Sequence, residues 1–163
     1  MYKIAVITVS DKGARGERVD ESGPAIREMV GQLGKVVNYQ VLPDDLDVLK
    51  EALINLSDRE RVDLIFTSGG TGLSPRDNTP EATLAVIKRE VPGLAEAMRT
   101  ESMKKTDKAM LSRAVAGIRN RTLIVNLPGS VKAVRECLEV ILPALPHGLE
   151  IMTGRGGECG STS

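Results

Sequence analysis

Short apolar runs alternate with amphipathic stretches along most of this chain, and this alternation restricts the fold more than any other feature of the sequence. The mostly apolar residues 4–9, residues 36–42 and the short continuous apolar run at residues 64–66 predict strands. The run at 64–66 is typical of a strand covered on both faces. Between them, apolar residues spaced three or four apart predict helices over residues 24–33, 46–56 and 80–91. Strands that alternate with helices predict βαβ units on a mostly parallel sheet.

The second half of the chain continues this pattern with one difference. Residues 94–103 predict a weaker helix, and the polar residues 104–112 predict no regular element. Two strands over 114–118 and 122–127 are expected to form an antiparallel hairpin, followed by helices over 131–141 and 144–152. We therefore expect an α/β fold: a three-layer sandwich whose mostly parallel sheet has helices on both faces and includes one antiparallel strand. Residues 1–153 are predicted to form a single domain, and the Gly/Ser-rich residues 154–163 a flexible tail.

The composition argues against several classes of function. The 163 residues include 22 Lys+Arg and 22 Asp+Glu, with the basic residues scattered, so we expect neither nucleic acid nor a membrane as a partner. No apolar run approaches the ~20 residues needed to span a bilayer, and the N-terminal segment lacks a signal-peptide pattern. Cys137 and Cys159 lack metal-type spacing, and His147 is the only histidine, so a His-based triad is not expected. A cytoplasmic protein is predicted.

Four polar loops are predicted to meet at one edge of the sheet. In an open parallel sheet the ligand lies beyond the carboxyl ends of the strands. The loops that follow the predicted strands there are residues 10–16, 43–45, 68–78 and 126–130. Together they hold most of the clusters of Gly, Asp and Ser in the chain, so we expect the functional site at this edge.

The longest of these loops has the features of a phosphate cradle. In Ser68-Gly69-Gly70-Thr71-Gly72, three glycines allow positive φ angles and let backbone N–H groups approach a ligand. Thr79-Pro80-Glu81 then predicts a helix start with Thr79 as the N-cap, and Ser130 is expected to cap a second helix in the same way. Helix N-termini favour anions. The alternative is that both loops only make tight turns into helices.

Two aspartates in these loops are candidate ligands of Mg²⁺, which prefers hard oxygen atoms. They are Asp44 and Asp77. Each also has a structural alternative: Asp44 or its neighbour Asp45 is a natural N-cap for the next helix, and Asp77 can pair with Arg76 or form an Asx-turn. Three loop cations, Lys12, Arg15 and Arg76, are candidates for neutralising phosphates or are simply solvated.

The segment from Thr67 to Gly72, followed by Arg76-Asp77 and Thr79-Pro80-Glu81, closely resembles the signature of the molybdenum-cofactor biosynthesis family. That family includes the Mog-type molybdopterin adenylyltransferases, the MoaB proteins and the G domain of gephyrin. The likeness extends over nearly the whole chain, from Lys3 to about Gly148. Its further motifs are Ser10-Asp11, Pro43-Asp44-Asp45, Leu111-Ser112-Arg113 and Asn126-Leu127-Pro128-Gly129.

The resemblance implies ATP-dependent adenylylation of molybdopterin, with Mg²⁺ as cofactor, ATP as co-substrate and pyrophosphate as product. It also implies a homotrimer and a hand-over of the product to a molybdenum insertase. The two acids that the family requires match Asp44 and Asp77, as catalytic residues and metal ligands. Residues matched to binding of molybdopterin and ATP are Ser10, Asp11, Ser68, Gly69, Gly70, Thr71, Gly72, Arg76, Thr79, Pro128, Gly129 and Ser130. The alternative within the family is a non-catalytic, trimeric molybdopterin-binding protein of the MoaB type.

Overall fold

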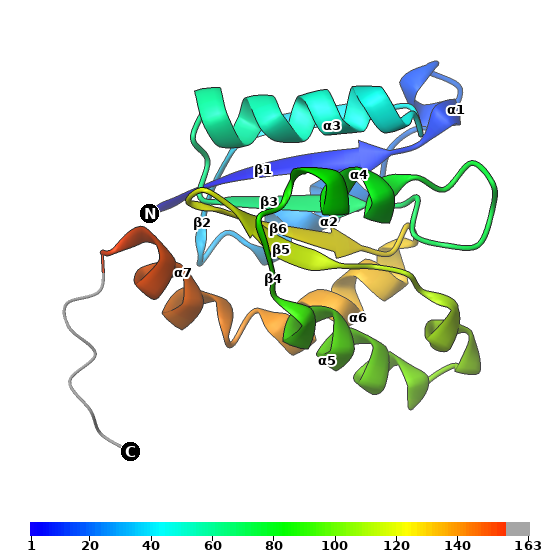
Figure 1. The fold of residues 1–163 in the computed structure, drawn as a ribbon. Coiled ribbons are helices and arrows are strands. Elements are labelled where there is room, and N and C mark those ends of the chain that lie inside the picture. The colour runs from blue at the N-terminus through cyan, green and yellow to red at the C-terminus, as the bar shows by residue number, and fades with distance from the viewer. Residues whose placement is uncertain (156–163) are drawn as a thin grey trace.

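The computed structural model describes residues 1–155 and is built around one six-stranded sheet in the order β2-β1-β3-β6-β5-β4 (Figure 1). Four strands are parallel: β1 (Tyr2–Val9), β2 (Gly34–Leu42), β3 (Leu64–Ser68) and β6 (Thr122–Leu127). The strand β5 (Ala116–Arg119) is antiparallel to β6, and the short β4 (Arg89–Glu90) is antiparallel to β5. Only β5 therefore runs against the common direction, which confirms the predicted sheet with one antiparallel strand.

Helices cover both faces of this sheet because its strands are apolar on both sides. Ala5 and Ile7 of β1 face α3 (Leu46–Ile54), the π-helical turn η1 (Asn55–Arg59) and α4 (Thr79–Val86). Ile4 and Val6 face the other layer. That layer consists of α2 (Ser22–Met29), α5 (Pro92–Met103), α6 (Val131–Ile141) and α7 (Leu145–Thr153), as Figure 1 shows. The expected three layers are confirmed.

The structure corrects the prediction for residues 80–91. The helix α4 ends at Val86, and Ile87 has an extended backbone with φ −73° and ψ 152°. The residues that follow pair with β5: Lys88 N donates to Ile118 O at 2.8 Å and Val91 N to Ala116 O at 2.9 Å. Pairing with a strand that would otherwise be the edge of the sheet thus outweighs the helical pattern.

Two short elements lie where no regular element was predicted. The single turn α1 (Asp11–Ala14) begins directly after β1 and is capped by the Ser10 hydroxyl, which accepts from Gly13 N at 3.0 Å. The 3₁₀ turn η2 (Asp107–Leu111) lies in the polar stretch after α5.

Gly154 has φ 68° and ends α7. Most of the predicted tail, residues 154–163, and Cys159 within it lie outside the described residues. Within residues 1–155, no helix is both long enough and apolar enough to cross a membrane.

Candidate active site

The glycine loop after β3 is shaped by close contacts that only glycine allows. Gly69 and Gly70 have φ angles of 99° and 69°. A Cβ on Gly69 would lie 2.6 Å from the carbonyl oxygen of Val9, and a Cβ on Gly70 would lie 2.8 Å from Asp44 Oδ2. The loop therefore passes directly against the end of β1 and against a carboxylate, an approach that a residue with a Cβ would block.

Two predicted binding hydroxyls instead hold this loop in place. Thr79 Oγ1 donates to Gly69 O at 2.9 Å, and Ser68 Oγ donates to Pro128 O at 2.8 Å. Both residues are only 1% exposed. The predicted N-cap role of Thr79 is wrong: the cap position belongs to Asn78, which makes no capping side-chain bond. These two hydroxyls help to position the loop.

The largest cavity that we describe, of about 750 Å³, opens beside this loop at the carboxyl ends of β1, β3 and β6. Six of the predicted binding residues line it: Ser10, Ser68, Gly69, Gly70, Gly129 and Ser130. Ser130 caps α6 by accepting from Ala133 N at 3.2 Å, as predicted. The cavity thus combines glycine-loop backbone with a helix N-terminus, an arrangement suited to an anion.

The start of α2 supplies a wall of this cavity that the sequence analysis missed. Residues 18–22 line it, including Asp20 and Ser22. Asp20 accepts hydrogen bonds from Ser22 N, Gly23 N and Thr8 Oγ1, and Ser22 Oγ donates to Gly129 O at 2.9 Å. An acid followed by Ser-Gly-Pro is a helix-start signal, and it could have revealed this wall.

The hydroxyl of Tyr39 also donates to Asp20. Burial, reinforced by this carboxylate, raises the pKa of Tyr39 to about 12. The phenol therefore stays protonated at neutral pH and keeps this donor in place.

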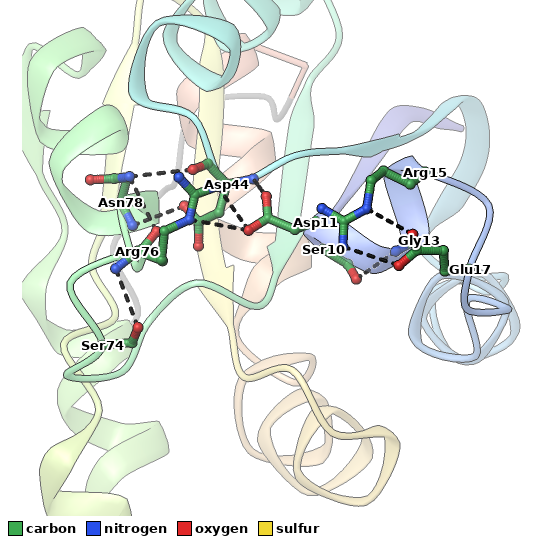
Figure 2. Close-up of polar contacts among 9 residues, drawn as sticks. All are labelled: Ser10, Asp11, Gly13, Arg15, Glu17, Asp44, Ser74, Arg76 and Asn78. Carbon is green, nitrogen blue, oxygen red and sulfur yellow. Dashed lines mark hydrogen bonds and ion pairs between the residues drawn. The ribbon is translucent and has the colours of Figure 1, made fainter.

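A second part of the site is a network centred on Asp11 (Figure 2). Its Oδ1 accepts from Asp44 N at 2.9 Å, and its Oδ2 accepts from Arg76 Nη2 at 2.8 Å and Nε at 3.2 Å. Bonding to Arg76, and then to the Asp44 N–H, lowers the pKa of Asp11. Arg76 therefore pairs with Asp11. The alternative ion pair between Arg76 and Asp77 does not form in this structure. Asp11 ties three loops together.

Asp44 does not cap α3, which was the structural role considered for it in place of metal binding. Asp45 caps α3 by accepting from Val48 N at 3.0 Å, whereas Asp44 accepts from Asn78 N at 3.0 Å through Oδ1. Asp44 is 7% exposed, and burial raises its pKa, with the charges of Asp77 and Asp11 acting in the same direction. A buried carboxylate near two other acids is suited to binding a cation.

Asp77 lies at the other end of the glycine loop. Its Oδ2 accepts from Ser74 N at 3.0 Å, and a Cβ on Gly72 would lie 2.9 Å from the same oxygen. In the described part of the chain, Asp44 Oδ2 and Asp77 Oδ1 have no hydrogen-bond donor. Each aspartate thus supports a loop with one oxygen and leaves the other available.

These carboxylates fit Mg²⁺ better than they fit an all-protein metal cage. Within residues 1–155, no three His, Cys, Asp or Glu side chains are grouped so that they could hold a metal ion. Mg²⁺ usually takes only one or two carboxylates and completes its shell with water and substrate phosphates. Asp44 and Asp77, each with one available oxygen beside the glycine loop, are the residues that could hold such an ion.

Arg113 clamps the loop that carries Asp77, a role that the residue type alone did not indicate. Its Nε donates to Gly72 O at 2.7 Å and its Nη2 to Asp77 O at 3.0 Å, while Nη1 pairs with Glu81. Its backbone N donates to Thr71 O at 2.9 Å. One guanidinium thus holds both ends of the loop from Gly72 to Asp77.

The remaining predicted residues lie at the margins of the site. Thr71, Gly72 and Pro128 line a second cavity of about 290 Å³, together with residues of α5 and η2. Arg15 pairs with Glu17 at 3.0 Å and does not point to a phosphate role. Figure 2 shows that this pair lies on the far side of Asp11 from Arg76.

Comparisons with known proteins agree with this geometry. Residues 5–147 match the family model described as a probable molybdopterin binding domain. The chain is 42% identical over 154 residues to the molybdopterin adenylyltransferase of Helicobacter pylori strain J99, covering 93% of this chain and 88% of that one. It is 40% identical over 163 residues to gephyrin of Dictyostelium discoideum, covering 93% of this chain but 23% of gephyrin.

Among solved structures, the molybdopterin biosynthesis enzyme MoaB of Thermus thermophilus superposes with a TM-score of 0.90 at 54% identity, covering 94% of this chain and 98% of that one. The family match spans the strands and all four loops that form the site. The chain therefore belongs to the molybdopterin-binding family of molybdenum-cofactor biosynthesis.

Proposed function

We propose that this protein is a molybdopterin adenylyltransferase, which transfers the adenylyl group of ATP to molybdopterin. The observation that carries the proposal is that the glycine loop passes directly against Asp44 and Asp77, each with one available oxygen. Phosphoryl-type transfer requires a protein to position anions and to stabilise their charge, and it needs no covalent nucleophile. Relatives at 42% identity that carry this activity in their names support the same assignment.

The chemistry is a displacement at phosphorus. An oxygen of the terminal phosphate of molybdopterin attacks the α-phosphorus of ATP, the bond from that phosphorus to the bridging oxygen breaks, and pyrophosphate leaves. Backbone N–H groups of the glycine loop and the N-terminus of α6 hold the phosphates in the cavity. Asp44 and Asp77 would hold Mg²⁺, which offsets charge on the nucleotide and on the leaving pyrophosphate when it is bound.

The decisive experiment measures pyrophosphate release from ATP and Mg²⁺, with and without molybdopterin. For the wild type we expect release that depends on molybdopterin. Asp77→Asn keeps an oxygen that can accept from Ser74 N but loses the charge, so turnover should fall by about 100-fold or more while molybdopterin binding is largely retained. Asp47→Asn is the matched control, because Asp47 is exposed on α3. Equal losses of binding and turnover in Asp77→Asn would contradict the assigned role.

The second candidate is a non-catalytic molybdopterin-binding protein of the MoaB type. The observation in its favour is that both carboxylates already accept backbone hydrogen bonds and so have a structural use without catalysis. Tight molybdopterin binding without pyrophosphate release by the wild type would establish this function and refute the first.

Assembly and location form part of the same proposal. Leu73, Met110 and Leu111 are 65%, 61% and 50% exposed. Arg113 holds their two segments together through Thr71 O and Gly72 O. An apolar surface of this kind favours contact with further copies, so we propose that the protein forms a homotrimer. We also propose that it works in the cytoplasm. The product of the reaction, adenylyl-molybdopterin, contains a phosphoanhydride bond and would pass to a molybdenum insertase that consumes it.

A further inference from the structure

A separate cavity of about 410 Å³ lies at the edge of the sheet opposite the glycine loop. It is formed around the amino ends of three parallel strands, because Lys3 is near the start of β1, Asp63 precedes β3 and Thr122 begins β6. The turn after α3 and the β5–β6 hairpin complete the wall. Nothing in the proposed adenylyl transfer uses this edge.

The cavity has an excess of positive charge although the whole chain is neutral by formal charge. Four cations line it: Lys3, Arg61, Arg121 and Arg155. It also contains two carboxylates, and both have a cation: Asp58 pairs with Arg119 at 2.7 Å and Asp63 with Arg155 at 3.7 Å.

Within residues 1–155, three of the four cations remain uncompensated. Lys3, Arg61 and Arg121 have no carboxylate within ion-pair distance there. Arg121 donates to a neutral acceptor, the carbonyl of Thr153. A concave site lined by unpaired cations focuses a positive potential and favours an anion.

The wall also includes an unusual turn. Ser57 is 4% exposed and lies in η1, and π-helical turns are frequent at functional sites. Arg61, two residues beyond this turn, has φ 53°, a left-handed conformation that favours glycine. An anion in the cavity would give the Arg61 guanidinium the charged partner that no carboxylate among residues 1–155 supplies.

We propose that this cavity binds a small phosphate-bearing anion, with Lys3, Arg61 and Arg121 neutralising its charge. Arginine is suited to this task because its planar guanidinium matches the geometry of a phosphate. The cavity volume lies within the usual range for a small-ligand site. The shared chemistry is a phosphate group, whose source is either a free inorganic anion or a nucleoside phosphate.

The test counts bound phosphate groups per chain by equilibrium dialysis, with pyrophosphate and AMP as separate probes. The double variant Lys3→Gln/Arg61→Gly removes two cations, and glycine suits the positive φ, so the thermal unfolding midpoint should equal or exceed that of the wild type. We expect the variant to bind one equivalent fewer of the preferred probe, with its affinity at this cavity lowered by about tenfold or more. Arg89→Gln, an exposed arginine on β4, is the control and should bind as the wild type does.

Counting equivalents separates this cavity from the glycine-loop site, where the same probes are also expected to bind. Preference for pyrophosphate or for AMP would identify the source of the phosphate. An unchanged number of equivalents in the folded double variant would overturn the proposal. Pyrophosphate release by the double variant should match the wild type, so a failure of this proposal and a failure of the proposed enzyme activity are distinguishable.

Discussion

Asp44 is the site residue whose charge most clearly lowers the stability of the folded protein. Burial raises its pKa, so its ionised form is disfavoured in the folded state. A carboxyl whose pKa is raised on folding stabilises the protein at pH values below its unfolded pKa, and this contribution is lost as the pH rises through the folded pKa. Asp44→Asn removes the charge and keeps an oxygen that can accept from Asn78 N.

We therefore expect Asp44→Asn to raise the unfolding midpoint at neutral pH and to lower adenylyl transfer by about 100-fold or more. The stability gain should shrink as the pH falls below the Asp44 pKa. Thermal unfolding at neutral and acidic pH measures this difference, with Asp47→Asn as control. A variant less stable than the wild type at neutral pH would show that Asp44 mainly supports the loop.

Arg113 acts through the backbone of the loop that carries Asp77. Its guanidinium bonds to Gly72 O and Asp77 O at once, which the single ammonium of lysine cannot reproduce. Arg113→Lys should reduce kcat by about 10-fold to 100-fold through misplacement of Asp77, with a smaller change in KM. Arg119→Lys is a matched control, because Arg119 bonds to Val86 O and Asp58 at the opposite edge of the sheet. Equal kcat values for the two variants would show that Arg113 does not position Asp77 for the reaction.

The sequence predicted which residues gather at the site better than it predicted their partners. Asp44, Asp77 and the glycine loop were expected at one edge because parallel strands bring their carboxyl ends together. Asp44 is engaged by Asn78 and Asp11, and Arg76 pairs with Asp11 rather than Asp77, through contacts between loops far apart in sequence. Local patterns do not contain that information.

At the scale of elements, Asn126 connects the layers of the sandwich. Its Nδ2 donates to Thr67 Oγ1 on β3 and to Thr83 Oγ1 on α4, both at 2.9 Å. Its Oδ1 accepts from Val115 N at 3.2 Å. Asn126, Thr67 and Thr83 are at most 1% exposed, so their side chains cannot turn to water.

Asn126→Ala should lower the free energy of unfolding by about 3 kcal/mol, because it leaves several buried polar groups unpaired. Denaturant unfolding measures the loss. Asn38→Ala is a control, because the Asn38 amide bonds to Glu60 at the surface and should contribute much less. A loss of less than about 1 kcal/mol would mean that water or local rearrangement satisfies the freed groups.

The elements with a strong periodic pattern were predictable, and those defined by pairing were not. The strands β1, β3 and β6 follow largely apolar runs, so their existence follows from burial on both faces. The edge strand β2 instead alternates between more and less buried residues, a pattern of period two. The two-residue strand β4 has no periodic signal, and it exists because Lys88 and Val91 bond to β5. Tertiary pairing thus set the end of α4, which the sequence placed at residue 91, several residues too late.

At the scale of the whole molecule, three exposed apolar side chains near the loop held by Arg113 form a candidate contact between copies of this chain. Leu73 follows the glycine loop, and Met110 and Leu111 belong to η2. All three are at least half exposed, and their segments are joined by the contacts of Arg113. Water in contact with this surface is costly, and a second copy that covers it would also restrain the loop that carries Asp77.

We therefore expect the wild type to be a trimer in size-exclusion chromatography with light scattering, and Leu73→Asp/Leu111→Asp to shift it towards the monomer. Burying two new carboxylates at a contact costs several kcal/mol, about enough to change the dissociation constant by 1000-fold or more. Ile151→Asp is the control, because Ile151 is 62% exposed on α7 and lies apart from this surface. If assembly restrains the loop, the double variant should also lose turnover at low protein concentration and regain part of it when concentrated. A trimer that persists in the double variant would place the interface elsewhere, and a monomeric wild type would show that one chain forms the site alone.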